Sequence, residues 1–289
     1  MDARHFLGLE ATSDPLRWRL PVTTAVSTPG RFLFGGCGLA AGIVALEEVA
    51  QRPTVWATAQ YLAYAPTGSV LDWEVVVAAS GRHTTQGRAI GRLDDREVLT
   101  VNAALGHNEL DISGRWVEAP DVPAPLDCPE QETPLMFADS VFDRVEHRLA
   151  RGRLLSELDG RPGEGRTASW TRVPGHLEPS AATLAVIGDY VSGGVSQPVG
   201  ARMMGRSLDN TLRVAELVPT EWVLCDIHIH ALVGGFGHGL AHLWAEDGTL
   251  LGTASQSISV RPWPGDRAVR EGLAGAIPRS DRSGTEGRA

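Results

Sequence analysis

The second half of this 289-residue chain resembles the first when it is shifted by 152 positions, and this internal repeat limits the possible folds most. Because the matches run without a gap across strand-like segments, they predict a duplicated unit. The alternative is that any two amphipathic sheets share such a pattern by chance. The matched positions are Glu74–Val77 over Asp226–Ile229, Gly87 over Gly239, Ala89 over Ala241, Asp94–Asp95 over Glu246–Asp247, and Val98–Leu99 over Leu250–Leu251.

Each copy contains one helical segment followed by strand-like segments. In the first copy, residues 34–51 are rich in Ala, Leu, Ile and Val, which predicts one buried helix. A second helix is expected near residues 180–192, where Pro179 occupies the favoured first turn. An α+β fold follows, with an antiparallel sheet wrapped around a long helix in each copy. The expected strands are 54–64, 70–79, 87–93, 98–105, 141–150, 167–173, 207–217, 222–231, 237–245 and 250–261.

These segments predict two domains, 1–118 and 141–263, joined by a linker at 119–140. The linker contains five prolines between Ala119 and Pro134, which favours a loop. Residues 264–289 are rich in Gly, Arg and Asp and are expected to be disordered.

Composition excludes several function classes. The net charge is −9, the opposite of the balance that phosphate-binding nucleic-acid proteins usually show, so no nucleic-acid partner is expected. The three cysteines are far apart, which fits a reducing compartment and no disulfide framework. Neither a signal peptide nor an apolar run long enough to span a membrane is apparent. We therefore expect a cytoplasmic protein without membrane insertion.

Three motifs resemble the type II acyl-CoA thioesterases, the TesB-like double hotdog enzymes. Arg31-Phe32-Leu33-Phe34-Gly35-Gly36 resembles the family's Phe-Gly-Gly entry to the first helix. Ser207-Leu208-Asp209-Asn210 resembles its Leu-Asp-His segment, and residues 247–256 resemble its last strand, which ends in Gln. Their order and spacing across residues 15–263 make the match more specific than any motif alone.

The resemblance implies two fused hotdog domains and hydrolysis of an acyl-CoA thioester without a cofactor or a metal. In that family an Asp, a Ser or Thr, and a Gln position the attacking water. Carried over, these positions are Asp209, His230 and Gln256, so that an imidazole replaces the hydroxyl group. A carboxylate can deprotonate water, and a neutral imidazole could share that role.

Two kinds of substrate contact are predicted, one for the oxyanion and one for the acyl chain. The backbone N–H groups of Gly35 and Gly36, at a helix start, could stabilise the oxyanion. Met203 and Met204 could line the acyl pocket, although a role in the core is equally consistent with their sequence. Cys37 replaces the Gln that the family often carries there, and is expected to be a small core residue. Hotdog proteins commonly associate through sheet edges, so a homo-oligomer remains open.

The main alternatives are a non-catalytic acyl-CoA-binding protein and a metal-binding protein. His228 and His230 share one strand face, as do His238 and His242 on the next strand, so the four could form a metal site near Asp226. A double hotdog hydratase would need an Asp followed by a His five residues later. Val214 and Ala231 stand at that spacing from the two candidate aspartates, which argues against a hydratase.

The 152-residue shift also predicts a single active site. It places Asp209, His230 and Gln256 over Ala57, Ala78 and Ala104. Alanine side chains cannot bind water, so the N-terminal copy would serve as a scaffold.

Overall fold

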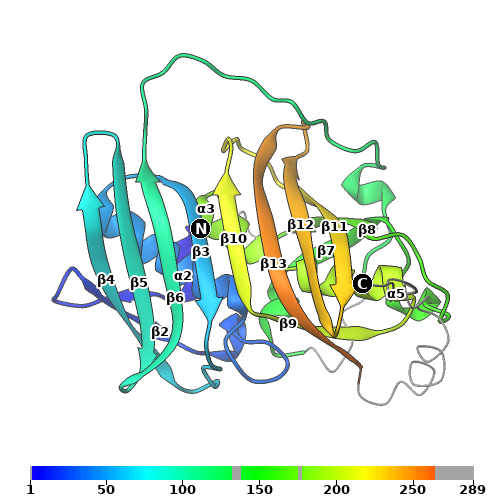
Figure 1. Ribbon diagram of the computed structural model, residues 1–289, viewed down its shortest axis with the longest axis horizontal. Coiled ribbons are helices and arrows are strands. Elements are labelled where there is room, and N and C mark those ends of the chain that lie inside the picture. The colour runs from blue at the N-terminus through cyan, green and yellow to red at the C-terminus, as the bar shows by residue number, and fades with distance from the viewer. Residues whose placement is uncertain (1, 132–137, 175–177, 264–289) are drawn as a thin grey trace, which may run out of the picture.

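The computed structural model describes residues 2–131, 138–174 and 178–263. Within them, thirteen strands form one antiparallel sheet, and the helices lie behind it in the view of Figure 1. The predicted disordered tail lies outside the described residues. No helix among the described residues is both long and apolar enough to cross a membrane. The strand order is β1-β2-β4-β5-β6-β3-β10-β13-β12-β11-β8-β7, and β9 also pairs with β13.

The N-terminal half forms one side of this sheet. A long loop leaves β6 and arches over the top of the molecule in Figure 1. The domain boundaries at 118 and 141 remain a prediction. The elements of this half are α1 (Ala3–Leu7), β1 (Glu10–Ala11), β2 (Arg17–Pro21), η1 (Thr24–Val26), α2 (Gly35–Ala50), β3 (Thr54–Tyr61), β4 (Val70–Ser80), β5 (Thr84–Leu93) and β6 (Arg96–Gly106).

The C-terminal half continues the sheet and repeats the order of a helical segment before the strands β10 to β13. A short 3-10 helix occupies the first part of the strand predicted at 141–150, so that strand begins later than expected. The elements are η2 (Pro125–Asp127), η4 (Val141–Arg144), β7 (Glu146–Arg151), η5 (Leu155–Glu157), β8 (Arg166–Arg172), α3 (Ala181–Ile187), α4 (Val191–Gly194), α5 (Ser196–Val199), β9 (Met203–Ser207), β10 (Asp209–Val214), β11 (Val223–Val233), β12 (Phe236–Ala245) and β13 (Leu250–Pro262).

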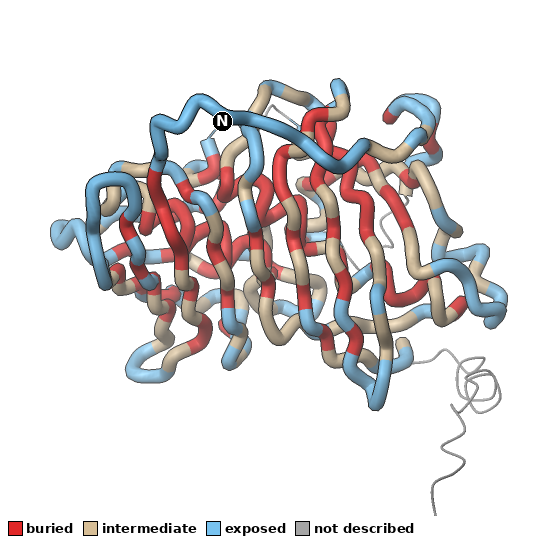
Figure 2. The backbone as a smooth tube through the Cα atoms, turned by 45° about the horizontal axis from the view of Figure 1, so that its top comes forward, coloured by how far each residue is buried: buried red, intermediate tan, exposed pale blue. Residues whose placement is uncertain are grey.

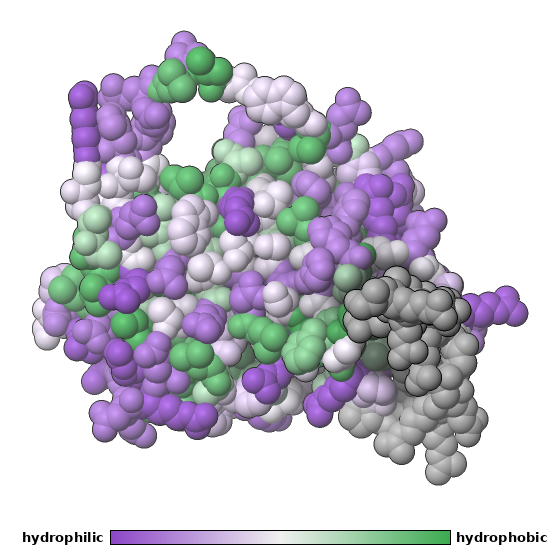
Figure 3. Space-filling view, in the orientation of Figure 1, coloured by the Kyte–Doolittle hydropathy of each residue, from purple (hydrophilic) through white to green (hydrophobic). Residues whose placement is uncertain are grey.

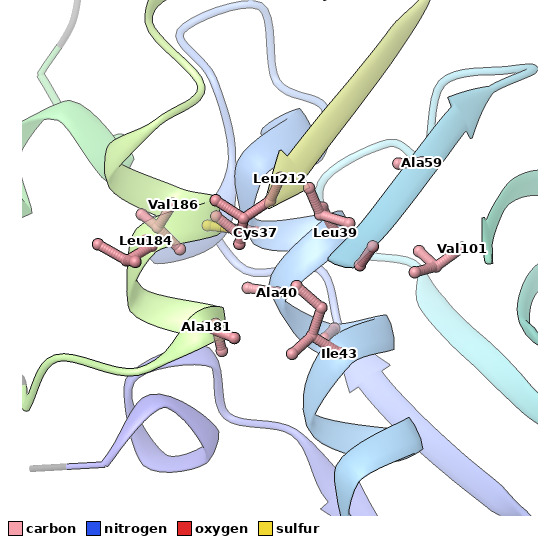
Figure 4. Packing of buried hydrophobic residues seen from close by; sticks show 14 of the residues in the cluster. Cys37, Leu39, Ala40, Ile43, Ala59, Val101, Ala181, Leu184, Val186 and Leu212 are labelled. Carbon is pink, nitrogen blue, oxygen red and sulfur yellow. The ribbon is translucent and has the colours of Figure 1, made fainter. Parts of the chain in front are cut away.

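Helix α2 confirms the helix predicted at residues 34–51. It ends where Gln51 adopts a left-handed conformation and donates its N–H to Glu47. The residues from Gly36 to Leu46 are all buried, because the helix lies between the sheet and α3. Figure 4 shows this packing, with Cys37 and Ala40 of α2 close to residues of α3. Burial on all sides explains why the helix is apolar around its whole circumference.

The second helix differs from the prediction, because it is broken rather than continuous over residues 180–192. Helix α3 starts at a Ser180 cap and ends at Gly188, and two short helices follow. Gly188 ends α3, and the two glycines at 193–194 end α4, since glycine does not favour a helix interior. The break turns the N–H of Ser192 away from the helix, toward β13.

The two halves join through β3 and β10, which pair in antiparallel orientation. Thr58 pairs directly with Thr211, and their hydroxyl oxygens are 2.7 Å apart. The tube in Figure 2 shows buried and less buried residues alternating along the strands, as expected for a sheet that buries one face. Figure 3 views the opposite, outer face, where hydrophilic and hydrophobic side chains are mixed.

The repeat is confirmed in the middle strands of each half. Val77 pairs with Gly87, and at a shift of 152 positions Ile229 pairs with Gly239. Both strand pairs also contain an irregularity at the next residue, Ala78 in one half and His230 in the other. A strand irregularity kept at the same place supports duplication.

In β13 and β10 the equivalent residue of the first half lies one residue further back than a shift of 152 positions predicts. The turn from β5 to β6 contains Asp94 and Asp95, whereas the turn from β12 to β13 also contains Gly248, in a left-handed conformation. Gln256, which pairs with Gly239, is therefore equivalent to Ala103, which pairs with Gly87.

Two equivalences predicted from the sequence are consequently wrong by one residue. Gln256 does not correspond to Ala104. Thr58 and Thr211, which pair across the junction, occupy equivalent positions in the two halves. Two residues earlier on each strand, Asp209 is therefore equivalent to Trp56 and not to Ala57. The residue equivalent to Ala57 is Asn210.

Candidate active site

A buried carboxylate lies at the start of α2, and it comes from the other half of the chain. Asp189 follows α3 and is 4% exposed. Its Oδ2 accepts the backbone N–H of Gly36 at 2.5 Å. The N-terminus of a helix favours a negative charge, because its first N–H groups are free and the peptide dipoles are aligned. The arrangement therefore stabilises an ionised carboxylate inside the protein.

Two amide side chains bind the other oxygen of Asp189. The Asn210 side chain donates from Nδ2 to Oδ1 at 2.9 Å, and Gln256 donates from Nε2 to the same oxygen. Both amides are almost fully buried. Asn210 lies on β10 and Gln256 on β13, and the alternation of side chains along a strand directs both to the inner face of the sheet, toward the helices. The carboxylate thus has partners from three separate elements.

Gln256 also connects Asp189 to a hydroxyl group. Its Nε2 donates to the Ser207 Oγ at 3.2 Å, and its Oε1 accepts the N–H of Ser192 at 3.1 Å. The Ser192 contact fixes the orientation of the amide, so that its NH₂ group faces Asp189 and Ser207. A carboxylate, a hydroxyl and an amide therefore meet at one place.

Burial raises the pKa of Asp189 to about 7, although the hydrogen bonds from Gly36, Asn210 and Gln256 act in the opposite direction. A carboxylate with a pKa near neutrality can accept a proton at the pH of the cell and release it afterwards. Perturbed carboxylates of this kind cluster at functional sites.

Three buried polar atoms around Asp189 make no well-aligned hydrogen bond within the described part of the chain. They are the hydroxyl groups of Tyr61 and Tyr190 and the Oδ1 of Asn210. The Asn210 side chain is nevertheless close enough to the Tyr61 hydroxyl to lower its pKa, so these two groups interact loosely and could turn toward a bound ligand. The Tyr61 hydroxyl and the Oδ2 of Asp189 both face the Cα of Gly35, at 3.0 and 2.8 Å from the position of a Cβ there.

The close approach of the two halves depends on Gly36. A Cβ at this position would lie 2.8 Å from the carbonyl oxygen of Ala185 and 2.8 Å from the Cβ of Asp189. We expect Gly36→Ala to lower the free energy of unfolding by about 1–3 kcal/mol, as overpacking typically does. Denaturant unfolding measures this, with Gly193→Ala as control, because nothing lies within 4 Å of a Cβ there. An unchanged stability of Gly36→Ala would contradict this account of the contact.

The predicted residue Asp209 lies apart from this cluster. Because it precedes Asn210 on the strand, its side chain points to the outer face. Its Oδ1 accepts the N–H of Ser257 at 2.7 Å, at the break between β9 and β10, where β13 changes its strand partner. Asp209 thus completes the hydrogen bonds of the sheet at this break.

His230 also lies on the outer face, where its ring is 5.6 Å from that of His238. It lines an open hollow together with Asp209, Ser255, Gln256 and Ser257. The predicted residues Asp209, His230 and Gln256 therefore all border this hollow. The amide group of Gln256, however, binds Asp189 on the other face of the sheet, because adjacent strand residues alternate between the two faces.

The other predicted residues lie on two elements that also carry groups of the cluster, α2 and β9. Gly35 and Gly36 form the first turn of α2, but the N–H of Gly36 is engaged by Asp189. Met203 is half-buried, packs against the core and donates its N–H to the Ser196 Oγ, whereas Met204 is half-buried and pairs with Arg261. Cys37 is fully buried, and burial raises the pKa of its thiol far above the usual range, which excludes a reactive thiolate.

Asp189 and Ser207 were missed by the sequence-based prediction. The signal for Asp189 was a lone carboxylate inside the apolar run that forms α3 and α4, since an unpaired charge is rarely buried without a role. Ser207 stands at the start of the segment that was recognised, two residues before Asp209. The residue types implied by the resemblance are present, but at different positions.

Comparison with known proteins gives consistent results. Residues 120–260 match the family described as acyl-CoA thioesterase C-terminal domain. A structure from Novosphingobium aromaticivorans, assigned as a thioesterase, is 33% identical, covers 87% of this chain and 97% of its own, and has a TM-score of 0.78. A search of the curated proteins finds no match.

More distant structures show the same fold. A hot dog protein from Alicyclobacillus acidocaldarius is 19% identical, covers 90% of this chain and 98% of its own, and has a TM-score of 0.78. The acyl-CoA thioesterase II TesB2 from Mycobacterium marinum is 17% identical, with coverages of 91% and 98% and a TM-score of 0.71.

The double hotdog sheet and these matches place the chain among the thioesterases of the hotdog fold. The chain belongs to the TesB-like acyl-CoA thioesterase family.

Proposed function

We propose that the protein hydrolyses an acyl-CoA thioester to a free fatty acid and coenzyme A. The observation that carries the proposal is the meeting of Asp189, Ser207 and Gln256 at the start of α2. The Asp189 carboxylate takes a proton from a water molecule, which attacks the carbonyl carbon of the thioester. The Ser207 hydroxyl and the Gln256 amide hold this water. As the tetrahedral intermediate collapses, the C–S bond breaks and the protonated Asp189 gives its proton to the sulfur, so coenzyme A leaves as a thiol and Asp189 is ionised again.

Tyr61 is the proposed donor to the oxyanion. The Gly36 N–H, expected to serve here, already donates to Asp189. The Tyr61 hydroxyl is buried, makes no well-aligned hydrogen bond in the described residues and faces the same point as the carboxylate. Burial, followed by the charge of Asp189, raises the pKa of Tyr61 well above its usual value, although the Asn210 side chain acts in the opposite direction. The phenol therefore keeps its proton at neutral pH and can donate it to a developing negative charge.

The N-terminal half supplies the helix start and Tyr61 but no second reaction centre. Ala57 and Ala103 occupy the positions equivalent to Asn210 and Gln256, so the amide groups that hold the carboxylate are missing there. We propose one site per chain, in a cytoplasmic enzyme, with Met203 and Met204 among the substrate contacts.

An assay of free thiol release from acyl-CoA thioesters of several chain lengths tests this function. We expect turnover without added metal, and turnover that persists in the presence of a chelator. Binding of acyl-CoA without thiol release would instead identify a binding protein and would contradict the proposed activity.

The pH dependence distinguishes Asp189 from His230 as the base. Since the base must be ionised and the pKa of Asp189 is about 7, we expect kcat/KM to rise with pH to a midpoint near 7 and then to level off. His230→Thr should leave both the midpoint and the maximum unchanged, because its ring lies on the other face of the sheet. Loss of the rising limb in His230→Thr would assign the base to the imidazole instead.

A further inference from the structure

A second cluster of chemically active side chains lies on the outer face of the sheet, on the opposite side from Asp189. It consists of Asp226 and His228 on β11 and His242 on β12. One potential ligand atom from each residue lies within 4.8 Å of the other two. Asp226 and His242 are directly paired across the strands. Both strands have neighbours on each side, so the three side chains project from a rigid part of the sheet.

The cluster combines one carboxylate with two imidazoles, which are donors that a cation accepts. The Asp226 side chain is almost fully buried, and its two oxygens lie within hydrogen-bonding distance of Arg166 and His228. His228 is 34% exposed, which leaves a path from solvent to the cluster.

We propose that Asp226, His228 and His242 bind one divalent transition-metal ion, with Zn²⁺ as the preferred ion. Two imidazoles and one carboxylate are a donor set that Zn²⁺ accepts, and solvent completes a tetrahedral coordination on the open side. The ion would join β11 to β12 on the face away from the proposed reaction centre. This site is independent of the proposed hydrolysis, and it departs from the sequence-based expectation of a protein without metal.

Arg166 competes with the ion for the carboxylate. Its Nε donates to Oδ1 of Asp226 at 2.9 Å, and its terminal nitrogen donates to Oδ2 at 2.8 Å. His228 also contacts Oδ2, at 3.1 Å. An ion bound to Oδ2 would displace the terminal nitrogen of Arg166, which is one-third exposed and can turn toward solvent. Removal of the guanidinium group should therefore strengthen binding of the ion.

Calorimetric titration of the metal-free, full-length protein with Zn²⁺ tests the site, and Co²⁺ absorption reports its geometry. We expect one ion per chain, a Kd at least 10-fold higher for His242→Ala, and a Kd at least 10-fold lower for Arg166→Gln. The control is His238→Ala, because His238 forms a ring pair with His230 on the same strands.

Three results would overturn the proposal. The first is that Zn²⁺ binds neither to the wild-type protein nor to Arg166→Gln. The second is binding that His242→Ala leaves unchanged. The third is binding that His238→Ala weakens as much as His242→Ala does, which would indicate unspecific histidine binding. Circular dichroism of each variant verifies that the fold is retained.

Discussion

Replacement of Asp189 by Asn should lower kcat by about 10²-fold or more, the range expected when a general base is lost. The amide keeps the shape of the side chain and an oxygen that can accept the N–H of Gly36. Its nitrogen, however, cannot take a proton from water at neutral pH. Steady-state kinetics with an acyl-CoA substrate measure the effect, with KM expected to change much less than kcat.

The matched control is the same substitution at Asp209, which accepts a single backbone N–H on the outer face. Asp209→Asn should keep kcat within about threefold, because its remaining oxygen can still accept that N–H. A large loss in Asp209→Asn together with full turnover in Asp189→Asn would assign the base to the residue predicted from the sequence and would refute the mechanism proposed above.

Tyr61→Phe should lower kcat by about 10²-fold, since removal of one oxyanion donor typically costs about 10²–10³-fold in kcat. The ring would still fill its place beside Gly35, so the fold should be retained. Because the hydroxyl acts on charge that develops during the reaction, KM should change little. Single-turnover measurements separate this chemical step from product release.

Tyr64→Phe is the corresponding control. Tyr64 is 51% exposed, and its ring lies 4.5 Å from that of Phe32, outside the buried cluster. It should keep the turnover of the wild type. If the wild-type protein hydrolyses acyl-CoA and Tyr61→Phe hydrolyses it equally well, the oxyanion is stabilised by other groups and Tyr61 has a packing role.

Local patterns predicted most of the fold. The predominantly apolar segment at 34–51 indicated α2, and the 152-residue register identified the equivalent middle strands, which the structure shows to share an irregularity. The broken second helix was not predicted, because the interruption after Ile187 depends on how Ser192 and Asp189 bind groups from other elements. The extra residue at Gly248 changed the register of the last strand, and a shift of constant length cannot detect such an insertion.

The candidate site was predicted in part. The site proposed above shares Gln256 with the sequence-based prediction but contains Asp189 and Ser207 where the prediction has Asp209 and His230. A strand residue and its neighbour differ in face, and the break between β9 and β10 decides which face Asp209 takes. Contacts across the two halves brought Asp189 to the start of α2, and no local pattern contains that information.

The hydrogen bond between Gly36 and Asp189 has a consequence for the duplicated chain as a whole. The proposed base belongs to one copy, and the helix start that holds it belongs to the other. In the proposed mechanism a substitution at the helix start of the first copy would therefore affect the reaction in the second copy, although the first copy carries no amide groups at the equivalent positions. Fusion of the copies in one polypeptide keeps these two groups at a fixed ratio and at a high effective concentration, which a pair of separate subunits could lose by dissociation.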